Sequence, residues 1–196
     1  MRGAEMDSTA KSAIKKAKCL WAVIFGLGML VTLPFVIVLG LKMTEVENDP
    51  FFPSCVAPSG EGSMNVIDQS LRIKMALKFG FWALLVIAIN QFCIGFAPLP
   101  FDVGTAACLG CCGVCLFMFT ACLSTAWFIL APVYIFSYPG KYCSGKLVEG
   151  VDDLQDVTEW LKKVWIAYIV TVNIANCIIY CVMQVAIKAI KALAGN

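Results

Sequence analysis

The cysteines are the residues whose type and spacing could do chemistry in this chain. It contains 11 cysteines and no histidine. Four cysteines form the run CLGCCGVC, at Cys108, Cys111, Cys112 and Cys115. In a soluble protein a CxxC doublet is typical of a zinc or a redox site. Here the two pairs overlap, and successive residues of a helix point about 100° apart, so four thiolates converge poorly on one ion.

Three interpretations of this run compete. Helix packing is the simplest, because small residues alternate with the cysteines and let two backbones approach closely. These small residues are Gly104, Ala107, Gly110 and Gly113. S-palmitoylation of Cys108, Cys111 and Cys112 near a membrane surface is the second interpretation, and a metal or redox site is the third. We favour packing, with Gly104, Cys108 and Cys112 on the packing face, and we expect no metal.

Cys55 and Cys143 form a separate pair, because they lie in the two long loops between apolar segments. An even pair on one side of a membrane, in a compartment that can be oxidising, favours a disulfide. The sequence therefore predicts a bridge from the first long loop to the second. The alternative is two free loop thiols.

The residue types argue against catalysis. The absence of histidine removes the commonest general base and a frequent zinc ligand. The apolar segments contain no carboxylate, and their thiols lie among apolar neighbours, which raise the pKa of a cysteine. We therefore expect no catalytic residue and no cofactor, and we rank a membrane-embedded acyltransferase or thiol oxidoreductase last. A net charge of +2 is too small to indicate a nucleic-acid partner.

The composition indicates an integral membrane protein. The chain is 60% hydrophobic and 14% charged, with a mean hydropathy of +0.83. A soluble domain has about 45–50% apolar and about 25% charged residues. A helix needs about 20 apolar residues to cross a bilayer. Suitable runs occupy residues 19–41, 79–101, 108–135 and 164–187, the third bent or tilted near Pro132.

The segments between these runs set the expected topology, an all-α bundle of four membrane helices. They are a basic N-terminal segment (1–18), an outer loop (42–78), a Pro-rich inner turn (97–104), an acidic outer loop (138–163) and a short C-terminal tail (188–196). Lysines flank the first and last runs, whereas both long loops are acidic. The positive-inside rule therefore places both termini on the cytoplasmic or matrix side. Residues 66–78 are predicted to form an interfacial helix or an extension of the second span.

Polar residues recur along the fourth run at steps of three and four. They are Asn173, Asn176, Tyr180 and Gln184. This spacing puts them on one helix face, which should look away from lipid. One interpretation is hydrogen bonding within the bundle, and the other is the lining of a polar path between subunits. Thr32, Asn90 and Gln91 in the other spans are candidate partners, and because none of these groups is ionisable, a proton relay is disfavoured.

The stretch WFILAPVYIFSYPGKYCSGKL, residues 127–147, resembles part of the transmembrane protein 272-like tetraspan family. Members have a Trp-rich third span that ends near an aromatic-Phe-Ser step and precedes an outer-loop cysteine. LPFVIVLG at residues 33–40, followed by Cys55, is similar to the proline-containing first span of that family and its downstream cysteine. The resemblance implies the same four-span topology. The family has no clear biochemical activity from which a function could be inferred.

Together these features predict a non-enzymatic, four-span membrane protein. We expect it to act as a structural or accessory subunit that packs in the bilayer against other membrane subunits or further copies of itself. The alternative is a pore-forming or transport subunit of an oligomeric channel, by analogy of architecture with large-pore junctional channels. The charge pattern suits a plasma membrane or endomembrane, and a mitochondrial inner membrane also fits it.

Overall fold

The computed structural model describes the backbone of residues 2–96, 103–147 and 154–194. Four long helices account for most of it. They are α1 (Arg2–Asn48), α2 (Gln69–Phe96), α3 (Val103–Phe136) and α5 (Gln155–Ala194). The shorter elements are β1 (Val56–Pro58), β2 (Val66–Asp68) and the helix α4 (Tyr138–Cys143).

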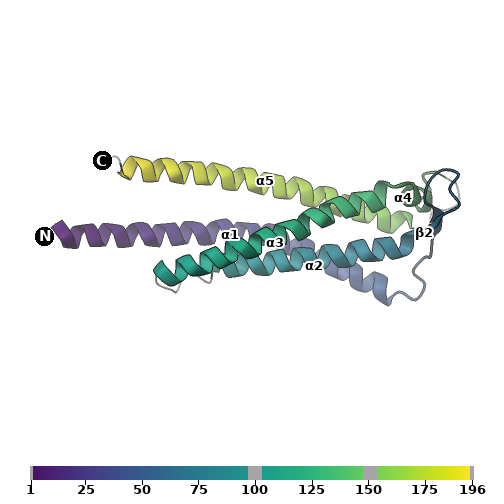
Figure 1. Ribbon diagram of the computed structural model, residues 1–196, viewed down its shortest axis with the longest axis horizontal. Coiled ribbons are helices and arrows are strands. Elements are labelled where there is room, and N and C mark those ends of the chain that lie inside the picture. The colour runs from purple at the N-terminus through teal and green to yellow at the C-terminus, as the bar shows by residue number, and fades with distance from the viewer. Residues whose placement is uncertain (1, 97–102, 148–153, 195–196) are drawn as a thin grey trace.

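The four long helices lie side by side in an elongated bundle (Figure 1). Both strands and α4 lie at one end, which we call the cap end. The start of α1 and the end of α5 lie at the other, which we call the terminal end. Each long helix contains a stretch long and apolar enough to cross a membrane: 18–48, 69–93, 118–136 and 155–182. The mainly helical architecture with four such helices is thus as predicted.

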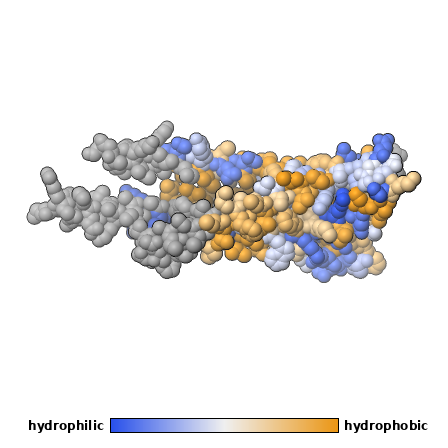
Figure 2. All heavy atoms as spheres, viewed as in Figure 1, coloured by the Kyte–Doolittle hydropathy of each residue, from blue (hydrophilic) through white to orange (hydrophobic). Residues whose placement is uncertain are grey.

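Figure 2 shows why this architecture suits a bilayer. Hydrophobic residues cover the middle of the bundle, and hydrophilic residues gather towards the cap end (Figure 2). Large apolar side chains that no other part of the chain covers include Leu30 and Leu41 on α1 and Ile174 on α5. A surface of this extent is costly in water and favourable against lipid chains.

The helices extend beyond the apolar runs of the sequence. α1 continues past Leu41 to Asn48, because no proline interrupts it before Pro50 and Lys42 pairs with Glu45 one turn later. α2 begins at Gln69, so residues 69–78 extend the second span, which was the second of the two interpretations, and residues 66–68 form β2. α5 likewise takes in the end of the acidic loop. The predicted inner turn falls largely at residues 97–102, outside the described residues.

The sequence did not reveal the two strands. They pair antiparallel with Ala57 opposite Ile67, and Gly62 turns the chain between them with a φ of 70°. Each strand has only three residues, and β1 ends in Pro58, which is unfavourable in a ladder. Strands this short carry too little alternation to be read from the chain.

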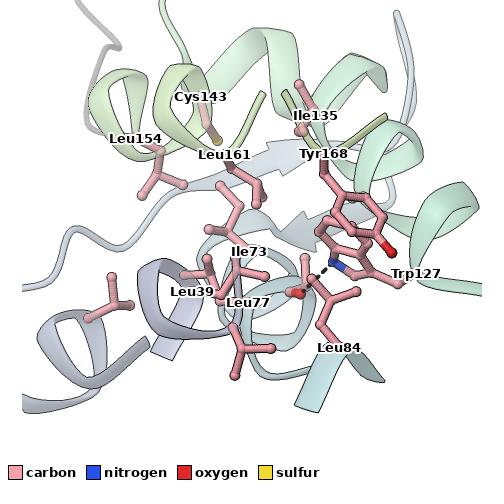
Figure 3. Close-up of a cluster of buried hydrophobic side chains, with 14 of the residues drawn as sticks. Leu39, Ile73, Leu77, Leu84, Trp127, Ile135, Cys143, Leu154, Leu161 and Tyr168 are labelled. Atoms are coloured by element: carbon pink, nitrogen blue, oxygen red, sulfur yellow. Dashed lines mark hydrogen bonds between the residues drawn. The ribbon is translucent and has the colours of Figure 1, made fainter. Parts of the chain in front are cut away.

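Trp127 of α3 belongs to the buried hydrophobic cluster and lies beside Tyr168 (Figure 3). Its side chain is fully buried, and its indole nitrogen donates a hydrogen bond to the backbone oxygen of Ala76 on α2 at 3.2 Å. Gly80 makes this approach possible, because a Cβ there would overlap the indole. Tyr168 of α5 packs edge-on against Trp127 at 5.4 Å, and Phe35 of α1 packs edge-on against Tyr168 at 5.2 Å. This aromatic layer therefore joins all four long helices.

The helices are unequally attached. α2 packs along much of α1 and α3, and its buried side chains include Ile73, Leu77 and Leu84. α5 makes far fewer contacts with α1 and α3. It lies against them towards the cap end and separates from α1 towards the terminal end (Figure 1). The bundle is therefore closed at the cap end and more open at the terminal end.

We expect Trp127→Ala to destabilise the bundle strongly. Truncating a buried tryptophan typically costs about 3–5 kcal/mol. The matched control is Trp82→Ala on α2, where the indole is 58% exposed and the loss should stay below about 1 kcal/mol. Reversible unfolding of the purified protein in mixed detergent micelles gives both free energies. Equal losses for the two variants would contradict the central position of Trp127.

Candidate functional site

A disulfide joins Cys55, which precedes β1, to Cys143 at the end of α4. The Cα atoms are 6.0 Å apart, and both side chains are buried. The bridge predicted from the sequence is thus confirmed. It links segments 88 residues apart in the chain and fixes the connection after α1 to the connection after α3.

Hydrogen bonds surround the Cys55 side of the bridge. The backbone amide of Cys55 donates to the hydroxyl of Ser70 at 2.7 Å, and the backbone amide of Gln69 donates to the Cys55 carbonyl at 3.0 Å. The Gln69 side chain is fully buried, and its Nε2 donates to the Tyr134 carbonyl on α3 at 2.7 Å. The start of α2 is therefore tied both to the disulfide and to α3.

The Cys143 side is tied to α5. The amide of Leu154, just before α5, donates to the Cys143 carbonyl at 3.1 Å. One turn into α5, Glu159 accepts a hydrogen bond from the Lys146 ammonium and lies 3.7 Å from that of Lys162. The hydrogen bond from Lys146, aided by the nearby lysine charges, lowers the pKa of the Glu159 carboxyl. We call this assembly of the strands, α4, the disulfide and the adjoining helix ends the cap.

The cysteine run lies on α3 at the terminal end. Cys115 is exposed, whereas the side chains of Gly104, Cys108, Cys111 and Cys112 lie outside the described residues. Within the described part of the chain, no group of three His, Cys, Asp or Glu side chains could hold a metal. Helix packing and palmitoylation at this run both stay predictions.

The polar residues of α5 do not share one environment. Asn173, Asn176 and Tyr180 are all exposed, and Tyr180 is 64% exposed. Gln184 is half-buried. Of the three exposed residues, Asn176 also lines a cavity between the helices, whereas Asn173 and Tyr180 do not. The Asn173 amide nitrogen donates to the Ile169 carbonyl of its own helix at 2.8 Å, so the expected bonding across the bundle does not involve it.

The cavity lies between all four long helices and has a volume of about 390 Å³, within the range of small-molecule pockets. Polar side chains from each helix reach it, among them Thr32, Gln91, Thr120 and Asn176. The Thr32 hydroxyl lies 2.9 Å from the Gly28 carbonyl and 3.2 Å from Gln91 Oε1. These contacts join α1 to α2 in the middle of the bundle.

The chemistry that this cavity offers is hydrogen bonding to a neutral group. None of its described lining residues carries a formal charge at neutral pH. Tyr168 of the aromatic layer lines its cap-side end. The lining brings hydroxyls and amides together with apolar side chains, without the base that a nucleophile needs.

Sequence reasoning identified some of these residues and missed others. Thr32, Gln91 and Asn176 were named as polar partners within the spans, and the structure brings them to one cavity. Thr120 and Ser124 were missed, although their spacing of four on an apolar run puts two hydroxyls on one helix face. A search of the third span for polar residues at steps of three and four, as was made for the fourth span, would have found them.

Comparisons with protein-family models, curated proteins and solved structures found no match to this chain.

We expect the disulfide to hold two fragments together after a cut in the hairpin. A protease site inserted after Gly60, which lies in open space between the strands, separates Cys55 from Cys143 upon cleavage. The fragments should migrate as one species on a non-reducing denaturing gel and as two after reduction. The Cys55→Ala variant should give two species in both conditions. Separation of the cut wild-type chain without reductant would contradict the bridge.

The pairing of Glu159 predicts an acid-sensitive cap. A carboxyl whose pKa is lowered in the folded state stabilises that state at higher pH, and this contribution disappears as the pH falls through the lowered pKa. Glu159→Gln should therefore unfold more easily than wild type at neutral pH, and the two should converge below pH 4.5, the ordinary value for the group. Because the pair is partly exposed, the difference is small.

The control for this titration is Glu61→Gln, at an exposed position of the hairpin. This variant removes a carboxylate that takes part in none of the described ion pairs, so it should unfold like wild type at neutral pH. Unfolding measured in detergent across this pH range separates the variants, and a Glu159→Gln profile parallel to wild type at every pH would contradict the coupling.

Proposed function

We propose that the chain is a non-enzymatic, four-span membrane protein that works as a structural or accessory subunit by packing α5 against another membrane helix. The observation that carries the proposal is the outward polar stripe of α5, which we define as Asn173 and Tyr180. Both are exposed in the single chain. A polar side chain that faces hydrocarbon is unfavourable, and a neighbouring helix can supply its hydrogen-bond partner.

The loose attachment of α5 supports this role. Leu161 and Tyr168 are buried where α5 meets the bundle, but Ile174, Ile178 and Val182 are exposed further along. The second half of α5 therefore presents a long surface of apolar side chains around the polar stripe. Such a surface suits a helix–helix contact, in which close packing and a few interhelical hydrogen bonds supply the affinity.

The proposal includes an orientation. Lys15, Lys16 and Lys18 lie on α1 towards the terminal end, whereas lysines at the cap end, such as Lys78 and Lys146, are paired with acidic residues. By the positive-inside rule, the terminal end faces the cytoplasm or matrix and the cap faces the opposite compartment. A buried disulfide in the cap agrees with this, because disulfides persist in oxidising compartments. A plasma membrane or endomembrane is the setting that we favour.

The polar stripe gives a direct test. Interhelical hydrogen bonds in membranes are worth about 0.6 kcal/mol each, so removing two should weaken association roughly five- to tenfold. We expect the Asn173→Leu, Tyr180→Phe double variant to shift the native-membrane complex towards the monomer in mild detergent. Chemical cross-linking in the membrane before extraction measures the change.

The matched control is Ile174→Leu, which also places leucine on the exposed surface of α5, one residue from Asn173. This variant should assemble like wild type. If the wild-type protein cross-links only as a lone monomer, or if the double variant assembles as well as the control, α5 does not act as a subunit contact through its polar stripe.

A further inference from the structure

We propose that the central cavity binds an uncharged lipid that carries a hydroxyl group at one end, of the sterol or monoacylglycerol kind. The proposal goes beyond subunit packing, because the site lies within one chain and requires only that the bundle crosses a bilayer. Its basis is the combination of a cavity of about 390 Å³ with a lining that mixes neutral polar and apolar side chains.

The lining sets the charge of the ligand. Its polar members are hydroxyls and amides, such as those of Thr32, Ser124 and Asn176, and none of the described members is charged at neutral pH. A phosphate or carboxylate headgroup would be desolvated there without a cation to neutralise it, which is strongly unfavourable. A hydroxyl can both donate and accept, so it matches this mixture of groups.

The arrangement along the helices sets the shape of the ligand. The lining of α5 extends from Tyr168 to Ile179, about 16 Å at a rise of 1.5 Å per residue. This is about half of the hydrocarbon core, so it fits one ring system or part of one acyl chain. The hydroxyls and amides lie along the middle of the cavity, and Ile24 and Ile179 line the part nearest the terminal end. The ligand hydroxyl is therefore placed deep, with the apolar body towards the terminal end.

The packing also supplies a route from the bilayer. The aromatic layer of Phe35, Trp127 and Tyr168 closes the bundle between the cavity and the cap. At the terminal end, α5 separates from α1 (Figure 1). The cavity itself is partly open to the surface of the bundle. A lipid can therefore enter it from the side, whereas the buried Trp127 lies between the cavity and the cap.

Photolabelling of the full-length protein in lipid nanodiscs tests this proposal. The probes are a photoreactive sterol and a photoreactive monoacylglycerol, each compared with its methyl ether, in which the hydroxyl can no longer donate. We expect one of the two hydroxyl probes to label peptides that line the cavity on α3 or α5, and to label more strongly than its ether. Whichever probe labels these peptides identifies the source of the hydroxyl.

Two alanines of α5 provide the matched variants. Ala175 lines the cavity, and Ala167 is exposed on the same helix. Ala175→Leu fills space that the ligand needs, so it should reduce labelling by about tenfold or more, a loss equivalent to at least 1.4 kcal/mol of binding. Ala167→Leu should leave labelling unchanged.

A second variant keeps the test informative if Ala175→Leu fails to fold. Asn176→Ala removes an amide without adding bulk, and should abolish the preference for the hydroxyl probe over its ether. Equal labelling of the two alanine variants, labelling confined to outward-facing peptides, or stronger competition by an anionic phospholipid would overturn the proposal. So would a water-filled cavity, detected as modification of an Asn176→Cys variant by a membrane-impermeant thiol reagent without labelling by either probe.

Discussion

The burial of one indole of α3 against α2 and α5 is the contact on which the rest of the structure depends. Trp127 reaches the backbone of α2 at Ala76 because Gly80 has no side chain, and Tyr168 and Phe35 complete the layer from α5 and α1. The indole nitrogen has its hydrogen bond, so this buried donor is paired. This layer divides the bundle into a cap that is fixed covalently and a half that encloses the cavity.

The cap and the cavity follow from different physical demands. At the cap end, the disulfide and the bonds of Gln69 hold two connections together over a buried hydrophobic cluster that includes Ile73 and Leu161. In the middle of the bundle, polar side chains are kept from hydrocarbon by facing one another, as Thr32 and Gln91 do. α5 is firmly held only on the cap side, so its remaining length is available to a ligand on one face and to another helix on the opposite face.

Much of this could be read from the chain, because hydropathy alone determines which segments can cross a bilayer. The Cys55–Cys143 pairing was also accessible, since the predicted topology put those two thiols in the same compartment. The roles of Trp127 and Gly80 were not, because a close contact between distant helices leaves no periodic signal. The polar spacing of α5 was recognised, yet it could not show that Asn176 lines the cavity whereas Asn173 and Tyr180 do not. That division depends on how α5 rotates against its neighbours.

The central claim is that the bundle is fixed at the cap end and open at the terminal end. The most direct test measures distances between spin labels on α1 and α5 by pulsed electron spin resonance. One spin-label pair replaces Leu41 and Lys163 near the cap, and the other uses the exposed native thiols Cys19 and Cys181. In each labelled variant, Cys55 and Cys143 are kept for the disulfide, and every other native cysteine that does not carry a label is replaced. We expect a narrow distance distribution for the pair near the cap and a broader one for the pair at the terminal end. Equally narrow distributions at both ends would contradict it.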